Sequence, residues 1–233
     1  MTITCLKFSV EEPSYLAVGF DYGDLLIVDV SSKSLEIVAR LCNQPSLKPV
    51  NVVDIFWTMR TDDKYAETDD QCEFLLKCSL NGCVVCYRQS NNVFTEKTIM
   101  ELFDDEISVP TDQDSGLLRK KSICSVTKMI GLNQNTYVVG TADGWVYSCL
   151  YENPTKYKYT TRTKAHFGII KSLEKSPYSW DVFLTTGDDF TIKIWVGDFF
   201  TEPVITLLAD TPIEKAIWSR TNSTIIVSVN GKV

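Results

Sequence analysis

The sequence predicts an all-β fold that is built from a repeated unit of short strands. Its 233 residues are 44% hydrophobic and 23% charged, which is the composition of a globular protein. Apolar strand patterns alternate with tight turns that contain glycine, aspartate or asparagine. The pattern returns at a period of about 40–60 residues, with several short strands in each unit. A repeat of this kind predicts a β-propeller.

Four such units and the beginning of a fifth can be delimited along the chain. The units cover residues 3–30, 50–88, 122–150, 166–196 and 212–233. In the fifth unit the sequence stops just after a turn, where a third strand is expected. Because ring closure normally takes about four to eight blades, we expect four blades and a truncated fifth within a larger ring of about seven. The alternative is a complete small propeller whose last blade is finished by the N-terminal strand.

A tight turn is expected between the second and third strands of each unit. Asn-Gly or Asp-Gly between two apolar runs is a strong hairpin signal, and the glycine supplies the positive φ that such a turn needs. The turn glycines predicted in this way are Gly23, Gly82, Gly144 and Gly231. In the fourth unit the glycine position is taken by Phe190.

Two acidic insertions interrupt the units, at residues 59–71 and 101–121. The second changes from acidic to basic along its length. A long stretch without a strand pattern is unusual inside a compact domain. We interpret both as loops that are either solvated or part of a surface for partner proteins, and the sequence does not separate these two interpretations.

The eight cysteines do not predict disulfides or a metal site. Several lie within apolar strand patterns, where a free cysteine behaves as a small hydrophobic residue. Cys83 and Cys86 have the spacing of half a zinc site, but residues three apart on a strand point to opposite faces. No second close pair of cysteines exists to complete such a site. We therefore expect no metal and no cofactor.

The overall charge argues against a nucleic-acid partner, because the chain carries a formal net charge of −7 and phosphate contacts need a basic surface. The longest apolar runs are far too short to cross a bilayer, and the first residues lack the pattern of a secretory signal. The expected protein is reduced, is not inserted in a membrane, and lies in the cytoplasm.

His166 is the only histidine, and it begins a stretch that ends at Trp195. A catalytic histidine needs a nucleophile or carboxylate partner in a pocket, and the sequence brackets none. It also has no glycine-rich phosphate loop and no nucleophile elbow. A structural role in a buried hydrogen-bond network is the better interpretation, and the protein is not expected to be an enzyme.

The stretch from His166 to Trp195 resembles a WD repeat, whose signature is a Gly-His pair, a turn aspartate and a closing Trp-Asp pair. Ala165 stands in place of the signature glycine, and Val196 stands in place of the final aspartate. The resemblance implies a structural network that consists of His166, Thr185, Asp189 and Trp195. The other units keep the turn but lack the histidine and the tryptophan.

Three passages are similar to the propeller of dynein intermediate chains. They read YLAVGFDYGDLLIVDV at 15–30, YVVGTADGWVYSC at 137–149, and KAHFGIIKSLEKSPYSWDVFLTTGDDFTIKIW at 164–195. Tyr178 departs from the phenylalanine that is common in the family. Together the passages favour the axonemal branch over the cytoplasmic one.

This resemblance implies a scaffold subunit without catalytic activity, which docks on a dynein heavy chain and supports assembly of the motor complex and ciliary movement. The implied partners are the heavy chain and other intermediate or light chains, and the implied location is the cytoplasm, the cytoskeleton and the axoneme of the cilium. In the family, light chains are recruited by a segment N-terminal to the propeller, so that role is not assigned to these residues. The alternative is a WD-repeat scaffold of another complex, such as a ubiquitin-ligase receptor or a trafficking coat.

Overall fold

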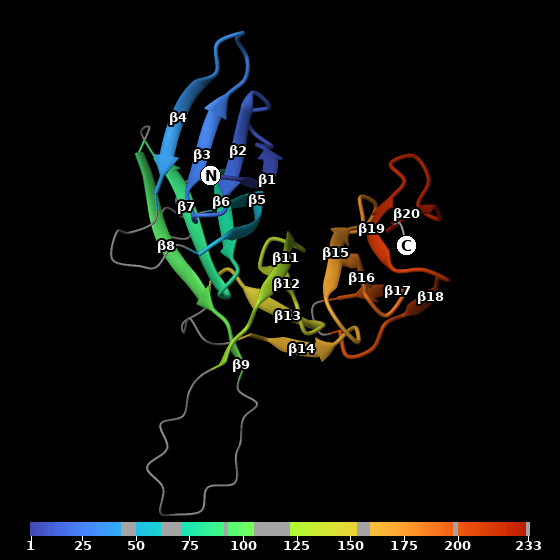
Figure 1. Cartoon of the computed structure of the whole chain (residues 1–233). Coiled ribbons are helices and arrows are strands. Elements are labelled where there is room, and N and C mark those ends of the chain that lie inside the picture. Colours follow the sequence, from blue (N-terminus) through green and yellow to red (C-terminus); the bar gives the residue numbers. More distant parts are fainter. Residues whose placement is uncertain are drawn as a thin grey trace, which may run out of the picture.

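The computed structural model describes the chain apart from residues 43–49, 62–70, 91–92, 105–121, 153–158, 198–199 and 232–233. The described residues form four four-stranded antiparallel sheets that follow one another along an arc (Figure 1). A two-stranded sheet follows the fourth, and a short two-stranded pairing lies between the second and third. In every sheet the strands are paired in chain order, so each sheet is a simple meander.

The strands of the first sheet are β1 (Ile3–Phe8), β2 (Tyr15–Phe20), β3 (Leu25–Asp29) and β4 (Glu36–Leu41). Those of the second are β5 (Val52–Thr61), β6 (Gln71–Ser79), β7 (Cys83–Ser90) and β8 (Val93–Glu101). Those of the third are β11 (Val126–Gly131), β12 (Thr136–Thr141), β13 (Trp145–Leu150) and β14 (Thr161–Lys164). Those of the fourth are β15 (Ile170–Lys175), β16 (Val182–Gly187), β17 (Thr191–Val196) and β18 (Ile205–Leu208). The last sheet contains β19 (Ile213–Trp218) and β20 (Ile226–Asn230), and the short pairing joins β9 (Phe103–Asp104) to β10 (Ser122–Ile123).

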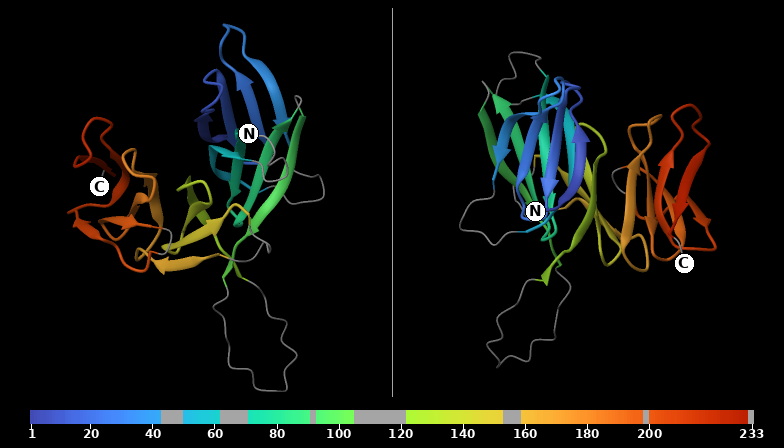
Figure 2. Two further views of the ribbon diagram at one scale, coloured as in Figure 1. Left: turned by 180° about the vertical axis from the view of Figure 1, so that it is seen from behind. Right: turned by 45° about the horizontal axis from the view of Figure 1, so that its top comes forward.

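The first strands of successive sheets contact one another in the order β1, β5, β11, β15, β19, and these strands lie on the inner side of the arc (Figures 1 and 2). This is the arrangement of propeller blades. The prediction of an all-β propeller, with four blades and two strands of a fifth, is confirmed.

The hydrophobic core is divided among the interfaces between blades. Ala17 and Ile27 of the first blade pack in one cluster with Ile55 and Leu75 of the second. The other three clusters join the second blade to the third, the third to the fourth, and the fourth to β19. A blade has two apolar faces and cannot bury either one alone, so the order of the blades along the chain decides what each face packs against.

A β-bulge recurs at the same place in all five main sheets. In each one, the pairing of the innermost strand shifts by one residue after its first paired position. The shift leaves one residue of the inner strand without a partner in the register. In two sheets this residue contacts the next blade: Thr127 Oγ1 donates to Ile170 O at 2.8 Å, and Lys171 Nζ lies 3.6 Å from Glu214 Oε1. Bulges bend and twist a strand, so the repeated bulge helps each inner strand to face its neighbour.

Most residues at the predicted tight turns have the positive φ of the left-handed region. Gly23, Gly82 and Gly144 have φ values of 88°, 79° and 84°. Phe190 has φ 61° and is the one non-glycine residue with positive φ in the described part of the chain. Gly231 follows β20 and lies outside the left-handed region, while the two residues after it are not described.

The fourth, outermost strands are the main difference from the sequence prediction, which contained three strands in each unit. Strands β4, β8 and β18 were not predicted, because their mostly exposed and polar faces lack a clear apolar alternation. The insertions also begin later than expected. Residues 59–61 continue β5, residue 71 begins β6, and residue 101 ends β8. Leu102 is buried, and residues 103–104 form β9. The other residues of the two insertions, 62–70 and 105–121, lie outside the described residues.

All eight cysteines are free thiols. Among the described residues no group of three histidine, cysteine, aspartate or glutamate side chains could hold a metal ion. The described ranges contain no helix that is long and apolar enough to span a membrane.

Candidate functional site

The four residues of the predicted network lie in the fourth blade and form one connected set of hydrogen bonds. His166 precedes β15, Thr185 lies on β16, Asp189 lies in the turn before β17, and Trp195 lies on β17. His166 Nε2 is 2.7 Å from Thr185 Oγ1, and His166 Nδ1 is 2.8 Å from Asp189 Oδ1. Trp195 Nε1 donates to Thr185 Oγ1 at 2.9 Å. The structure therefore brings together four residues that span 30 positions of the sequence.

The partners assign the tautomer of the histidine. An ionised carboxylate only accepts hydrogen bonds, so the proton lies on Nδ1 of His166, which donates to Asp189. Nε2 then accepts from the Thr185 hydroxyl, whose oxygen accepts in turn from the Trp195 indole. The chain of bonds runs in one direction and uses every polar atom of the His166 ring, so this imidazole has no capacity left for a substrate.

Thr191 is a fifth member that the sequence interpretation missed. Its Oγ1 donates to Asp189 Oδ1 at 2.8 Å and lies 3.0 Å from His166 Nδ1. The Phe167 amide donates to Asp189 Oδ2 at 3.1 Å, so both oxygens of the carboxylate are used. A threonine two residues after a turn aspartate was the available signal, because such side chains commonly bond within the turn.

Burial and hydrogen bonding together set the charges in the network. His166 is 1% exposed, and this burial lowers the pKa of its imidazole although Asp189 opposes the shift. Burial works against ionisation of Asp189 too, but the bonds from His166, Thr191 and the Phe167 amide hold the pKa of its carboxyl below its usual value. At neutral pH the network therefore contains a neutral imidazole and an ionised carboxylate.

Close packing leaves little space around the network. A Cβ atom on Gly187 would come within 2.5 Å of the His166 ring, so this position accepts only glycine. The buried indole of Trp195 stacks on Phe183 at a centroid distance of 6.2 Å and meets Phe200 edge-on at 5.7 Å. The network is thus enclosed by the core that joins the third and fourth blades.

The preceding blade fixes the backbone at the start of the network. The carbonyl of Gly144, in the turn of the third blade, accepts hydrogen bonds from the amides of Ala165 and His166 at 2.9 and 3.1 Å. A Cβ atom on Gly144 would lie 2.1 Å from His166 O. Glycine is required here for two reasons, its positive φ and this close approach.

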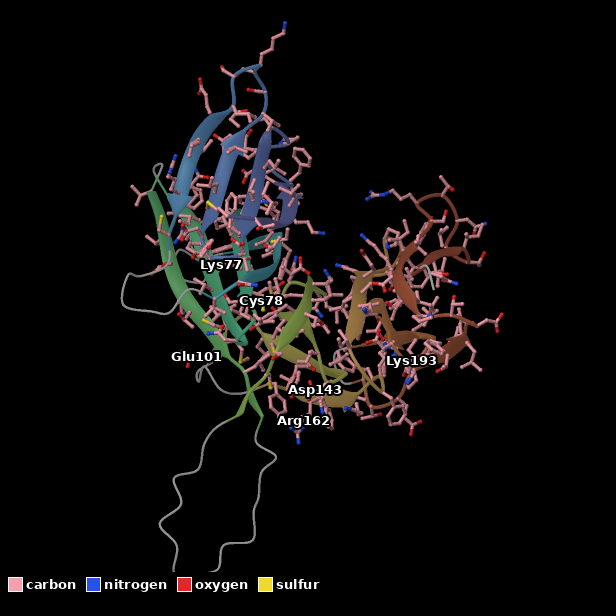
Figure 3. All side chains as sticks on the ribbon, in the orientation of Figure 1. Lys77, Cys78, Glu101, Asp143, Arg162 and Lys193 are labelled. Carbon is pink, nitrogen blue, oxygen red and sulfur yellow. The ribbon has the colours of Figure 1, made fainter. Side chains whose placement is uncertain are left out.

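The second blade fills the equivalent position differently. Lys77 lies five residues before Gly82, as Thr185 lies five before Phe190. Figure 3 labels this lysine on the second blade, and its side chain is 2% exposed. Its Nζ donates to Gly23 O at 3.1 Å and lies 5.6 Å from the centre of the Tyr87 ring. Burial lowers the pKa of this amine. Lys77 and Tyr87 therefore occupy the positions that Thr185 and Trp195 occupy in the fourth blade. Unlike Thr185, Lys77 bonds directly to the preceding blade.

A partly buried carboxylate joins the second and third blades. Asp54 Oδ2 accepts from the Met129 amide at 3.0 Å, and Oδ1 accepts from the Ile55 amide at 3.0 Å. Burial raises the pKa of Asp54, while Lys128 and the two amides act in the opposite direction. The sequence interpretation did not single out this residue.

No family model matches the chain. Curated relatives named dynein axonemal intermediate chain 4 align with most of it. The Homo sapiens protein is 22% identical over an alignment of 237 positions, which covers 98% of this chain and 27% of that protein. The Danio rerio protein is 25% identical over 84% of this chain and 24% of its own length. The chain spans about a quarter to a third of the length of the curated relatives that it matches.

Two solved structures, one of them a WD40 domain, have a similar fold. The C-terminal WD40 domain of Sif2 matches 97% of this chain and 51% of its own, with a TM-score of 0.59 and 13% identity. A chain of the mitotic checkpoint complex matches 98% of this chain and 58% of its own, with a TM-score of 0.65 and 14% identity. These likenesses establish the fold alone. The chain is thus an all-β WD-repeat propeller that resembles dynein axonemal intermediate chains over most of its length.

Proposed function

We propose that this chain is a scaffold subunit of the dynein intermediate chain type, which docks on a dynein heavy chain and supports assembly of a ciliary motor complex. The observation that carries the proposal is the similarity to dynein axonemal intermediate chain 4 over 98% of the chain. It covers all the blades rather than one repeat, and a single WD repeat would be a much weaker indication.

The chemistry of the network supports a role without catalysis. The only histidine is buried and bonded on both ring nitrogens, so it cannot reach a substrate. A propeller instead offers a rigid frame with loops at both ends of the blades, and loops on a rigid frame commonly bind partners. The proposed partners are the heavy chain and other intermediate or light chains, and the proposed location is the axoneme.

The proposal is tested by affinity purification of the tagged protein from ciliated cells of its source organism, followed by quantitative mass spectrometry. We expect a dynein heavy chain at near-equal abundance, and we expect it to be absent when an unrelated WD-repeat protein is tagged in the same way. Recovery of a different multiprotein complex without a heavy chain would reject the dynein assignment and favour the alternative, a WD-repeat scaffold such as a ubiquitin-ligase receptor or a coat component.

A further inference from the structure

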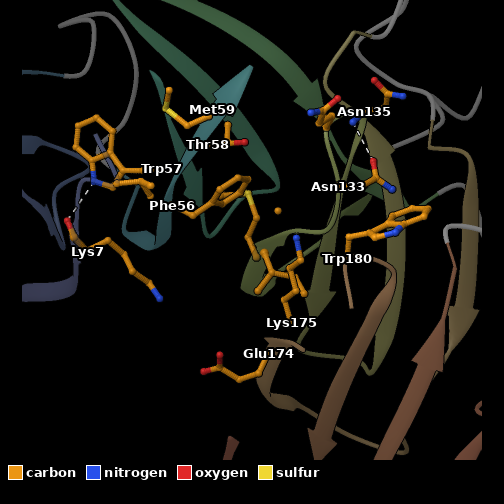
Figure 4. A pocket seen from close by; sticks show the side chains of 15 residues that line it. Lys7, Phe56, Trp57, Thr58, Met59, Asn133, Asn135, Glu174, Lys175 and Trp180 are labelled. Carbon is orange, nitrogen blue, oxygen red and sulfur yellow. Dashed lines mark hydrogen bonds between the residues drawn. The ribbon is translucent and has the colours of Figure 1, made fainter. Parts of the chain in front are cut away.

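A pocket with a volume of about 870 Å³ opens at the C-terminal ends of the inner strands (Figure 4). Residues of the first four blades line it, from Lys7 near the end of β1 to Trp180 in the loop after β15. It lies at the opposite end of the inner strands from His166, which precedes β15. The pocket is therefore separate from the buried network.

The floor of the pocket is apolar. Phe56 and Met129 form part of it, and both belong to the core between the second and third blades. Phe56 lines the pocket with only 9% of its surface exposed, and a Cβ atom on Gly131 would come within 2.9 Å of its ring, so the glycine makes room for the ring at this place. Trp57 is held across the boundary of the first and second blades, because its Nε1 donates to Lys7 O at 3.2 Å.

One large aromatic side chain at the edge of the pocket is not packed. Trp180 is 65% exposed, although it is the largest residue type and lies beside an apolar floor. Exposed tryptophans beside hollows are typical anchors of protein interfaces. Its loop is ordered by short-range bonds, including one from the Tyr178 amide to Ser176 Oγ at 3.2 Å, so the indole is presented on a defined turn.

The charged groups of the pocket favour an acidic partner. Lys7 and Lys175 contribute ammonium groups, and Glu174 contributes a carboxylate that lies 3.6 Å from Lys215 Nζ. Within the described part of the chain neither Lys7 nor Lys175 has a carboxylate at salt-bridge distance, although Lys7 and Lys128 are both close enough to Asp54 to act on the pKa of that carboxyl. On a chain with a net charge of −7, two such lysines beside an apolar hollow form a local region of positive charge.

We propose that this pocket binds an extended acidic segment of a partner protein, with a large apolar side chain of the segment inserted against Phe56 and Trp180. The acidic residues that flank the inserted side chain pair with Lys7 and Lys175. A volume of this size accommodates a few side chains and is within the usual range of binding pockets, about 300–1,000 Å³. The inference goes beyond the scaffold role and holds whichever complex contains the chain.

The test is fluorescence polarisation with the purified chain and three labelled peptides of equal length. The first has a central Leu-Trp pair between glutamate and aspartate residues, the second replaces the acidic residues with lysine, and the third replaces the central pair with serine. We expect the first peptide to bind with a Kd of about 1–100 μM, and the other two to bind at least about tenfold more weakly.

Variants locate the binding. Trp180→Ala and Lys175→Glu should each weaken the first peptide by about tenfold or more, and Lys175→Glu should also improve binding of the basic peptide. Phe167→Ala is the matched control, because this aromatic is 82% exposed at the other end of β15 and should leave the affinity unchanged. Both altered pocket side chains are exposed, so circular dichroism should report intact folding.

The proposal is overturned if none of the peptides binds, if the acidic and basic peptides bind equally, or if affinity survives both pocket variants. These outcomes are independent of the dynein assignment, because they are measured on the isolated chain. Loss of heavy-chain copurification with retained peptide binding would reject the proposed function and leave the pocket in place.

Discussion

At the scale of single residues, the buried side chains of His166, Thr185 and Trp195 form one connected network, whereas the buried hydroxyl of Thr186 in the same blade has no hydrogen-bond partner among the described residues. Trp195 contributes both the largest buried side chain and the hydrogen bond that completes the network at Thr185. Its role is therefore partly packing and partly polar, and removal of the indole leaves both a cavity and a threonine hydroxyl with one partner fewer.

Trp195→Ala should lower the free energy of unfolding by about 3–5 kcal/mol, the usual cost of deleting a large buried aromatic. Urea titration followed by circular dichroism measures the change. Trp180→Ala is the matched control, because the same substitution at an exposed position should alter stability by less than about 0.5 kcal/mol. A change below about 1 kcal/mol at Trp195 would contradict the network as a stabilising unit.

Because His166 is buried, the stability of the chain should depend on pH. Burial lowers the pKa of His166, so the unfolded chain takes up a proton at a higher pH than the folded chain does. The stabilisation from the neutral imidazole is complete above the unfolded pKa of about 6.5 and is lost as the pH falls below it. Between pH values of about 7.5 and 5.5, the unaltered chain should therefore lose more stability than His166→Gln does.

Urea midpoints of both chains at the two pH values measure this difference. The comparison is direct because His166 is the only histidine, and few other side chains titrate in this range. Equal pH dependence in the two chains would show that the folded and unfolded states bind the proton of His166 equally.

At the scale of elements, each blade is a meander whose inner strand carries a bulge and whose second turn is left-handed. The bulge places one side chain of the inner strand against the next blade, as Thr127 and Lys171 show. The turn places its backbone against the segment that leads into the next blade, as Gly144 does. The bulge and the turn therefore each provide polar contacts between neighbouring blades.

The turn residues predict opposite effects for two substitutions. Gly144→Ala adds a Cβ where the backbone of His166 approaches and where φ is positive, so it should cost about 2 kcal/mol or more. Phe190→Gly removes the strain of a left-handed non-glycine residue and should be neutral or stabilise the chain by up to about 1 kcal/mol. Thermal unfolding of both variants tests the pair, and a clear loss of stability in Phe190→Gly would show that the exposed ring has a packing role.

At the scale of the whole molecule, the interfaces between blades hold the core, and exposed apolar side chains remain on the first and last blades. Phe8 and Leu6 on β1 and Val229 on β20 are examples. Three cysteines, Cys78, Cys124 and Cys149, are buried together in the cluster between the second and third blades. Their reactivity therefore reports separation of those two blades.

Thiol labelling should divide the cysteines into fast and slow classes. Burial raises the pKa of the Cys78 and Cys149 thiols, so these residues have little thiolate and no access to reagent in the folded chain. They should react at least about tenfold more slowly than exposed Cys42, and all eight should react quickly in urea. Cys42→Ser should remove part of the fast class. Fast labelling of Cys78 in the folded chain would contradict a closed interface between the second and third blades.

The sequence by itself determined the class of fold, the order of the blades and the position of most turns. These features depend on local chemistry: apolar alternation, the positive φ of Gly23, Gly82 and Gly144, and one repeat with a recognisable pattern. The outer strands β4, β8 and β18 could not be predicted, because an exposed edge strand has no buried face to impose a pattern on its residues.

Only the tertiary structure decided what joins one blade to the next. Thr191, Lys77 and Asp54 are ordinary residues in the sequence, and each acquires its role from a partner that folding places beside it. The pocket beside Trp180 is of the same kind, because its lining comes from four blades. Contacts between residues far apart in the chain depend on how the blades pack, and strand periodicity carries no information about that packing.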